Sequence, residues 1–494
     1  MTLDTNVQEN KRQHLNTKSN NPSISISNLL PPFLWVLFVG NLVNILYFFP
    51  EMPQWTDGNL LQINGFTYLI WTTVSFFSAI VSSYAKNYLT GFIYKSKFMW
   101  LCLGFTLSVM TLVMANHLAL VIASWLLMGV FMSFLIGVNT EWKEAQEAFK
   151  FTLRYFLAGS LCLSIGLLLL AFQSDAFTLS GILSSLETIP GTTVFIAALF
   201  IIVAALIQSA IYPFHRWLLS AMTSPTPASA LMHAGFVNGS GILLALFASL
   251  LYTSNVLLDI LLIIGGLTAI IAQFTKLLQV NVKQKLACST IAQMGFMIMQ
   301  CGLGFFNAAV VHLILHGFYK AYLFLSSGEE IAATKPQNPP EIRIKPLQAL
   351  VVLIFGILGA GLFALFTGKG TQLDSGIFLT LIVAITVGQV TYNIVKEQRL
   401  SLSRKIILPP VLFFAGIGIY ALLYNGVTLM MADMPLVAEA LPLSVVQIIF
   451  GVIFLIGFFI MKLGVYRKIP WLYVKLLNLS QPNKKSIVFF KSNA

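Results

Sequence analysis

Charged residues are scarce in this chain. Only 9% of its 494 residues are Asp, Glu, Lys or Arg, whereas 57% are hydrophobic, and an ordinary soluble domain is about one-quarter charged. No soluble fold can hide that much apolar surface, so the composition excludes a soluble globular protein. Cysteine is rare as well. The four cysteines lie in apolar segments, at spacings that fit neither a disulfide framework nor a metal cluster, and we interpret them as small core residues.

Long hydrophilic stretches are also missing. The longest are residues 1–28, the connection 329–345 and the tail after residue 462. An enzyme acting on a soluble substrate would have no place for its active site, so we predict a transporter subunit, with any catalysis on a partner. Residues 1–28 are polar, and the span that follows lacks a small-residue cleavage site. This pattern predicts a disordered cytoplasmic arm and not a signal peptide.

Uncharged apolar runs, by contrast, recur along the whole chain. Each is long enough to cross a bilayer core of about 30 Å as a helix rising about 1.5 Å per residue. Because hydrocarbon offers no hydrogen-bond partners, such runs must form helices. The sequence therefore predicts an all-α polytopic membrane protein with about fourteen transmembrane helices. We place them at residues 29–49, 64–84, 99–115, 118–138, 152–172, 192–219, 226–252, 257–277, 286–302, 307–327, 346–370, 375–395, 406–424 and 443–462.

The net charge of +12 does not indicate a nucleic-acid-binding protein, because of where the basic residues lie. They fall in alternate connections between the predicted spans, and the other connections contain acidic residues. By the positive-inside rule, both termini are predicted to be cytoplasmic. Lys369 is the exception, since it is the only basic residue near the predicted outer side.

Two predicted spans carry signs of interruption. The sixth contains Tyr212-Pro213-Phe214, and the eleventh is rich in glycine around Lys369. Proline removes a backbone donor and kinks or breaks a helix. Breaks five spans apart indicate two inverted five-helix repeats, at 99–252 and 257–395, with further transmembrane helices at 29–98 and 406–462 and a cytoplasmic tail at 463–494. The alternative is that glycine and proline are simply common in membrane helices.

The tenth predicted span contains the densest group of ionisable residues. His312, His316 and Lys320 recur at positions i, i+4 and i+8, which places all three along one helix face. Ionisable groups inside a membrane are costly and are therefore functional candidates by default. We interpret this face as a proton pathway. The alternatives are a purely structural stripe, or a metal site, although no Glu, Asp or Cys shares the face.

Two further residues are less informative on their own. His233 follows a proline-rich turn in the seventh span, and alone it could equally be a core histidine with satisfied hydrogen bonds. Lys283, at the start of the ninth span, has the position of an ordinary positive-inside charge.

Three segments together resemble a known family. They are SPTPASALMHA at 224–234, VKQKLACSTIAQMGF at 282–296 and HLILHGFYKA at 312–321. They are similar to signatures of the antiporter-like membrane subunits of respiratory complex I and of multisubunit cation/proton antiporters. The resemblance, over about residues 64–400, implies two inverted repeats with broken helices and a polar axis that conducts protons. It assigns that role to six residues, namely His233, Lys283, His312, His316, Lys320 and Lys369.

The sequence departs from this family in its N-terminal half. Where the family has a glutamate directly after a tryptophan, Trp125 is followed by Leu126, and the partner lysine is replaced by Gln208. Losing both members removes an ion pair without leaving an unpaired buried charge. The N-terminal half-channel is therefore predicted to be stripped of its charges, whereas the C-terminal one is kept.

This pattern is similar to that of the DabB-type subunit of energy-coupled inorganic carbon accumulation systems, especially over STIAQMGFMIMQCGLG at 289–304. The resemblance implies a bacterial inner-membrane subunit that conducts protons or sodium. It also implies a cytoplasmic DabA-type, carbonic-anhydrase-like partner that holds zinc, with no cofactor in this chain. Three alternatives remain, namely a pumping subunit of an NADH or ferredoxin:quinone oxidoreductase, a multisubunit cation/proton antiporter, and a membrane scaffold without conduction.

Overall fold

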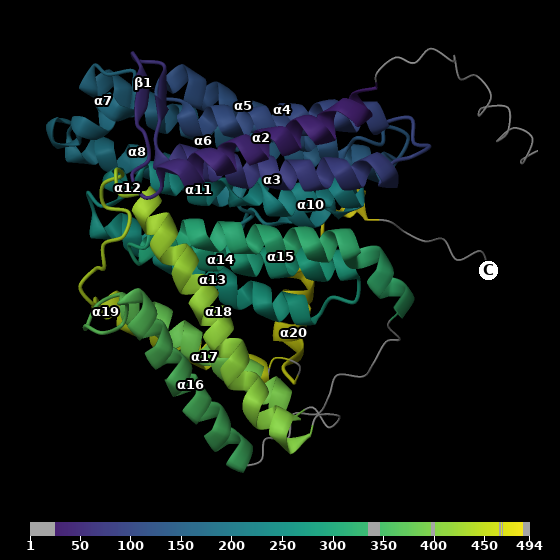
Figure 1. The fold of residues 1–494 in the computed structure, drawn as a ribbon, viewed down its shortest axis with the longest axis vertical. Coiled ribbons are helices and arrows are strands. Elements are labelled where there is room, and N and C mark those ends of the chain that lie inside the picture. The colour runs from purple at the N-terminus through teal and green to yellow at the C-terminus, as the bar shows by residue number, and fades with distance from the viewer. Residues whose placement is uncertain (1–24, 334–345, 397–400, 464–465, 467, 488–494) are drawn as a thin grey trace, which may run out of the picture.

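The computed structural model describes residues 25–333, 346–396, 401–463, 466 and 468–487. Residues 1–24 of the predicted N-terminal arm lie outside this part of the chain. Long helices dominate the fold, and most of them run side by side (Figure 1). The all-α membrane fold predicted from the apolar runs is confirmed.

The first part of the chain forms a layer of long neighbouring helices. These are α2 (Ile26–Phe48), α3 (Gly65–Tyr88), α4 (Lys95–Met114), α5 (Leu118–Ile136) and α6 (Lys143–Ser174), followed by the short α7 (Leu179–Ser184). Asn64 caps α3, because its side chain accepts a hydrogen bond from the Thr67 N–H at 3.0 Å while the Thr67 hydroxyl accepts one from the Asn64 N–H. Such a capping box satisfies backbone donors that the first helical turn leaves free.

A small hairpin departs from the all-α prediction. Strands β1 (Trp55–Asp57) and β2 (Leu61–Ile63) pair antiparallel, with Trp55 opposite Ile63. A hydrogen bond from the Asn116 N–H to the Leu60 carbonyl, at 2.9 Å, ties the hairpin to the α4–α5 connection. Strands of three residues are too short to produce a recognisable alternating pattern in the sequence.

The predicted break in the sixth span is confirmed. Helix α8 (Gly191–Gln208) ends before Pro213, and α9 (Arg216–Ser220) begins after it. Ala210 has a positive φ of 55°, and the Trp217 indole donates to the Ile207 carbonyl, in the last turn of α8, at 2.8 Å. The seventh predicted span is also divided, into α10 (Thr226–Ala234), α11 (Gly239–Leu246) and α12 (Ala248–Leu251).

Three long helices form the centre of the second half, namely α13 (Asn255–Leu277), α14 (Val282–Gly302) and α15 (Phe306–Ala333). Helices α13 and α14 pack backbone to backbone. A Cβ added to Gly302 would lie 2.3 Å from the Leu262 nitrogen, and one added to Gly265 would lie 2.6 Å from the Met299 nitrogen. Only glycine permits so close an approach.

The remaining helices diverge from this centre (Figure 1). They are α16 (Pro346–Thr367), α17 (Gly376–Lys396), α18 (Leu402–Met430), α19 (Val445–Leu463) and the short α20 (Pro470–Leu479). The most hydrophobic windows of α16 and α18 are only 17% and 22% buried. Their exposed apolar surface is that expected of helices that face lipid.

The glycine-rich segment of the eleventh predicted span lies at the end of a helix. Helix α16 stops at Thr367, and Gly368 and Gly370 have positive φ values of 68° and 76°. Lys369 therefore lies in the connection between α16 and α17, and not at an interruption within one helix. Positive φ values are open to glycine at little cost, which explains where the helix ends.

Each of the fourteen predicted spans coincides with one helix or with a series of two or three shorter helices. Among the described residues, eleven helices are both long and apolar enough to cross a membrane. The count of fourteen, the inverted repeats and the domain boundaries all stay predictions.

Candidate functional site

Helix α15 carries the predicted ionisable face into the interior of the molecule, where it packs against α10, α14 and α18. His316 is 5% exposed and Lys320 is fully buried. The His312 and His316 rings are nearly parallel, at 15°, with centroids 6.0 Å apart. The helical spacing therefore produces the common face that the sequence predicted.

Lys320 is held by neutral oxygen atoms of α14. Its Nζ donates to the Leu286 carbonyl at 3.0 Å and to the Ser289 hydroxyl at 2.9 Å. Within the described residues, the single ion pair joins the exposed Lys150 to Glu147. Lys320 therefore has no carboxylate partner there, and it can release a proton without leaving an unpaired negative charge beside it.

His233 and Lys283 lie next to this face. The fully buried His233 ring stacks on Phe324 at 4.3 Å between centroids. The Lys283 Nζ donates to the Ser224 carbonyl at 2.8 Å, at the proline-rich turn before α10. His233 interacts electrostatically with both Lys283 and Lys320.

The structure thus brings five of the six predicted residues together. His316 interacts electrostatically with Lys320, His312 and His233, which extends the series begun by Lys283. We call these five residues the central row. The row runs from the turn before α10 to His312.

The histidines of the central row have unpartnered ring nitrogens. These are both nitrogens of His233, both nitrogens of His316 and Nε2 of His312. A buried polar atom without a partner costs about 1–3 kcal/mol. Buried polar atoms without a protein partner usually bond ordered water, so these five nitrogens are suited to hold water along the row.

A cavity of about 360 Å³ adjoins His312. It lies between α14 and α15 on one side and α16, α17 and α18 on the other, and its lining is mostly apolar. The polar side chains that line it are Gln300, His312, Thr386 and Tyr420. Gln300 is 2% exposed, and its Oε1 has no partner. Gln300 was not among the residues predicted from the sequence, although a glutamine within an apolar span is a signal that could have pointed to it.

Lys369 lies apart from the central row. Its Nζ donates to the Ala438 carbonyl at 3.3 Å and sits 4.6 Å from the centre of the Phe305 ring. Both neighbours belong to connections on the predicted outer side. Partial burial lowers the pKa of Lys369, and the nearby Asp374 carboxylate opposes that shift.

In the N-terminal half, the sequence departs from the family pattern at Leu126 and Gln208, and neither of these side chains is charged. Gln208 is buried, and its amide donates to the Phe236 carbonyl at 3.2 Å. Next to it, the Ser209 hydroxyl contacts the Val237 carbonyl and the Ser240 hydroxyl. Leu126 is partly buried on α5, and neither α5 nor α8 contains an Asp, Glu, Lys or Arg.

Comparisons with known proteins identify chains that are similar to this one. The profile of the family "NADH:quinone oxidoreductase/Mrp antiporter, TM" matches residues 115–394. The chain is 34% identical to "Probable inorganic carbon transporter subunit DabB1" of Halothiobacillus neapolitanus, over 58% of this chain and 54% of that protein. It is 29% identical to subunit DabB of Bacillus subtilis, over 72% of this chain and 76% of that protein. The match to DabB1 thus spans about half of that relative's length.

A respiratory subunit is also similar. "NADH-quinone oxidoreductase subunit L" of Rickettsia felis is 29% identical, over 60% of this chain and 48% of that protein. Among solved structures, an Mrp complex from a Dietzia species has a TM-score of 0.61 at 22% identity, and covers 92% of this chain and 57% of that one. An archaeal membrane-bound sulfane sulfur reductase has a TM-score of 0.56 at 18% identity, and covers 92% and 91%. These two structures support the fold. Because the family profile matches more than half of the sequence, this chain belongs to the NADH:quinone oxidoreductase/Mrp antiporter transmembrane family.

Proposed function

We propose that this protein is the proton-conducting membrane subunit of an inorganic carbon transporter. The central row is the observation that carries the proposal, since it combines two lysines and three histidines without a carboxylate partner among the described residues. The similarity to subunits named DabB supports the substrate class. In this proposal, catalysis belongs to a partner subunit, a DabA-type protein with a carbonic-anhydrase-like zinc site on the cytoplasmic side of a bacterial inner membrane.

Conduction along the central row would require water between the side chains. The His312 and His316 ring centroids are 6.0 Å apart, which is too far for a direct hydrogen bond but suits a single bridging water. The unpartnered ring nitrogens would bond such waters. Each imidazole or amine accepts a proton from one side and releases it to the other.

The proposed route enters at Lys283 and passes His233, Lys320, His316 and His312. The cavity beside His312 and Gln300 would hold the water that continues toward Lys369. The uncharged surroundings of Gln208 make the N-terminal half a poor proton conductor. A single C-terminal route therefore suits the residues better than two half-channels.

Growth at ambient carbon dioxide would test the proposal. The host is a bacterium without its own carbonic anhydrase, and the partner subunit is co-expressed. We expect the wild type to restore growth and both Lys320→Ala and His316→Ala to fail. Lys150→Ala, which removes an exposed ion pair at 3.1 Å, is the control and should restore growth. Growth of both row variants at the wild-type rate would contradict the proposed route.

A second candidate function is a proton-pumping subunit of a quinone oxidoreductase or of a multisubunit antiporter. The similarity to subunit L favours it, whereas Leu126 and Gln208 weigh against a complete pump. Purification of the tagged chain from its native membrane distinguishes the two. Co-purified quinone-oxidoreductase subunits would support the second function, and a zinc-containing carbonic-anhydrase-like protein would support the first.

A non-conducting scaffold is the remaining alternative. Proton flux into liposomes that contain the wild-type chain, and its loss in Lys369→Gln, would contradict the scaffold. The same flux measurement with a sodium gradient would identify the conducted ion.

A further inference from the structure

The C-terminal helix α20 lies across the ends of the membrane-spanning helices. Figure 1 shows its axis running roughly at right angles to the axes of α13, α14 and α15. Leu476 is its buried residue, and it packs with Phe274 of α13 and with Tyr466. The helix therefore rests on the flank of α13 at the end that carries Lys276.

Contacts with the broken helix fix the C-terminal end of α20. The His215 Nε2 lies 2.7 Å from the Leu479 carbonyl, and the Asn483 N–H donates to the Ser220 hydroxyl at 2.9 Å. A carbonyl oxygen can only accept, so the His215 ring donates this hydrogen bond. Leu472, near the start of α20, packs against the same cluster as Leu476, so contacts along the helix hold it in one orientation.

The outward surface of α20 combines aromatic, aliphatic and basic side chains. Trp471 is 67% exposed and Val474 is 52% exposed, and Lys475 is exposed beside them. Aromatic rings and lysines next to aliphatic side chains are typical of short helices that lie in the plane of a membrane surface. A surface that faced only water would gain nothing from the indole of Trp471.

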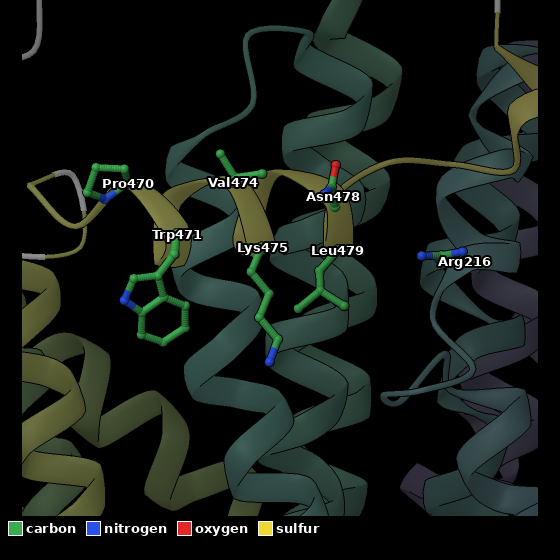
Figure 2. Close-up of a pocket in the computed structure, with 7 residues that line it drawn as sticks. All are labelled: Arg216, Pro470, Trp471, Val474, Lys475, Asn478 and Leu479. Carbon is green, nitrogen blue, oxygen red and sulfur yellow. The ribbon is translucent and has the colours of Figure 1, made fainter.

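A groove of about 530 Å³ lies beneath this surface, between α20 and the start of α9. Figure 2 shows Lys475 and Trp471 extending from α20 and Arg216 reaching toward the groove from the opposite side. The other lining residues are Pro470, Val474, Asn478 and Leu479, none of which is acidic. Neither Arg216 nor Lys475 forms an ion pair with another described residue.

We propose that this groove binds the phosphate of an anionic phospholipid from the cytoplasmic leaflet. The Arg216 guanidinium suits phosphate oxygens, and Lys475 adds a second positive charge. Trp471 and Val474 contact the glycerol and upper acyl region, where an amphipathic ring is most stable. Both cations lie at the end of the bundle that carries the basic connections, and the cytoplasmic leaflet is the one rich in anionic lipids.

A lipid fits the groove better than an acidic protein segment does. Trp471 and Val474 are exposed, although Leu476 of the same helix packs on α13, and α20 lies across the spans as an interfacial helix does. An acidic peptide would satisfy the two cations but would leave the Trp471 ring and Val474 without apolar contact. The proposal does not depend on whether the chain conducts protons.

Lipid retention by the purified full-length chain tests the proposal. The protein is delipidated and incubated with equimolar phosphatidylglycerol and phosphatidylcholine, and the bound lipids are counted by native mass spectrometry. Each basic residue near an anionic surface strengthens binding about fivefold, so Arg216→Gln with Lys475→Gln should lower phosphatidylglycerol binding by about thirtyfold. Lys484→Gln with Lys485→Gln removes the same charge from the same segment outside the groove lining and should preserve binding.

Two further measurements keep the proposal falsifiable. Arg216→Lys keeps the positive charge and should therefore retain most of the phosphatidylglycerol binding that the double variant loses. Both variants must elute like the wild type in size-exclusion chromatography, which shows that they are folded. Inorganic phosphate should not displace the lipid, since displacement would indicate a free-anion site. Unchanged phosphatidylglycerol binding in the double variant would overturn the proposal. The proposal would also be overturned if the double variant lost a bound protein partner but kept its phosphatidylglycerol, because the groove would then bind a protein segment.

Discussion

Replacing Lys320 tests the central row most directly. Lys320→Met keeps the length of the side chain but removes the ammonium group and its two hydrogen bonds, at 3.0 and 2.9 Å. Hydrogen bonds from a charged group contribute about 1.5–3 kcal/mol each, whereas burying a lysine at the centre of a membrane costs about 2.5–3.5 kcal/mol. The two effects partly cancel, so we expect the free energy of unfolding to change by no more than about 3.5 kcal/mol.

Proton conduction, by contrast, should disappear. The proposed route passes through Lys320, and the neighbouring Lys276 and Cys288 are not part of it, so the flux of Lys320→Met in proteoliposomes should fall to the level of empty vesicles. The assay imposes a potassium diffusion potential and follows a pH-sensitive dye trapped in the lumen. Lys285→Met, which changes an exposed lysine on the same side of the molecule, is the matched control and should conduct normally.

Lys320→Arg separates charge from titration. A guanidinium stays protonated under all assay conditions, so this variant keeps the positive charge but cannot release a proton. We expect it to conduct no better than Lys320→Met. A flux above half of the wild-type value in either variant would refute the role of Lys320.

Three further predictions concern the cavity, the outer lysine and the glycine contact. Gln300→Leu removes an unpartnered buried oxygen, so the melting temperature should stay the same or rise while proton flux falls severalfold. Partial burial disfavours the charged form of Lys369 in the folded protein and lowers its pKa, so the stability of the wild type relative to Lys369→Gln should increase as the pH rises from 7 toward 10, measured by thermal unfolding at each pH. Gly302→Ala places a methyl group 2.3 Å from a backbone nitrogen and should lower stability by about 1–3 kcal/mol. Gly361→Ala, where nothing lies within 4 Å, should leave the melting temperature unchanged or slightly higher.

The sequence was sufficient to predict the long helices and the ionisable face of α15. Both are local features, because apolar run length determines a span and the spacing of His312, His316 and Lys320 determines their common face. The break at Pro213 was predictable for the same reason, since proline acts on its own helix.

Features that depend on distant segments were not predictable from the residues alone. His233 and Lys283 were predicted as part of the proton pathway only because of a family resemblance. Their distance from Lys320 depends on how α10 and α14 pack against α15, and the residues alone do not determine that packing. Gln300 was missed because its cavity exists only once α16, α17 and α18 have docked. Helix α20 was predicted as part of a tail, since ten residues are too few to span a membrane.

The composition of the central row also bears on ion selectivity. A sodium ion that enters a protein must exchange its water shell for oxygen ligands, and cation-selective pores provide these as carboxylate or carbonyl rings. The row provides amines and imidazoles instead, whose nitrogen atoms can exchange protons but are poor ligands for a hard cation such as sodium. We therefore expect discrimination against sodium to arise from the chemistry of the side chains, so that widening the route should increase leakage of water before leakage of sodium.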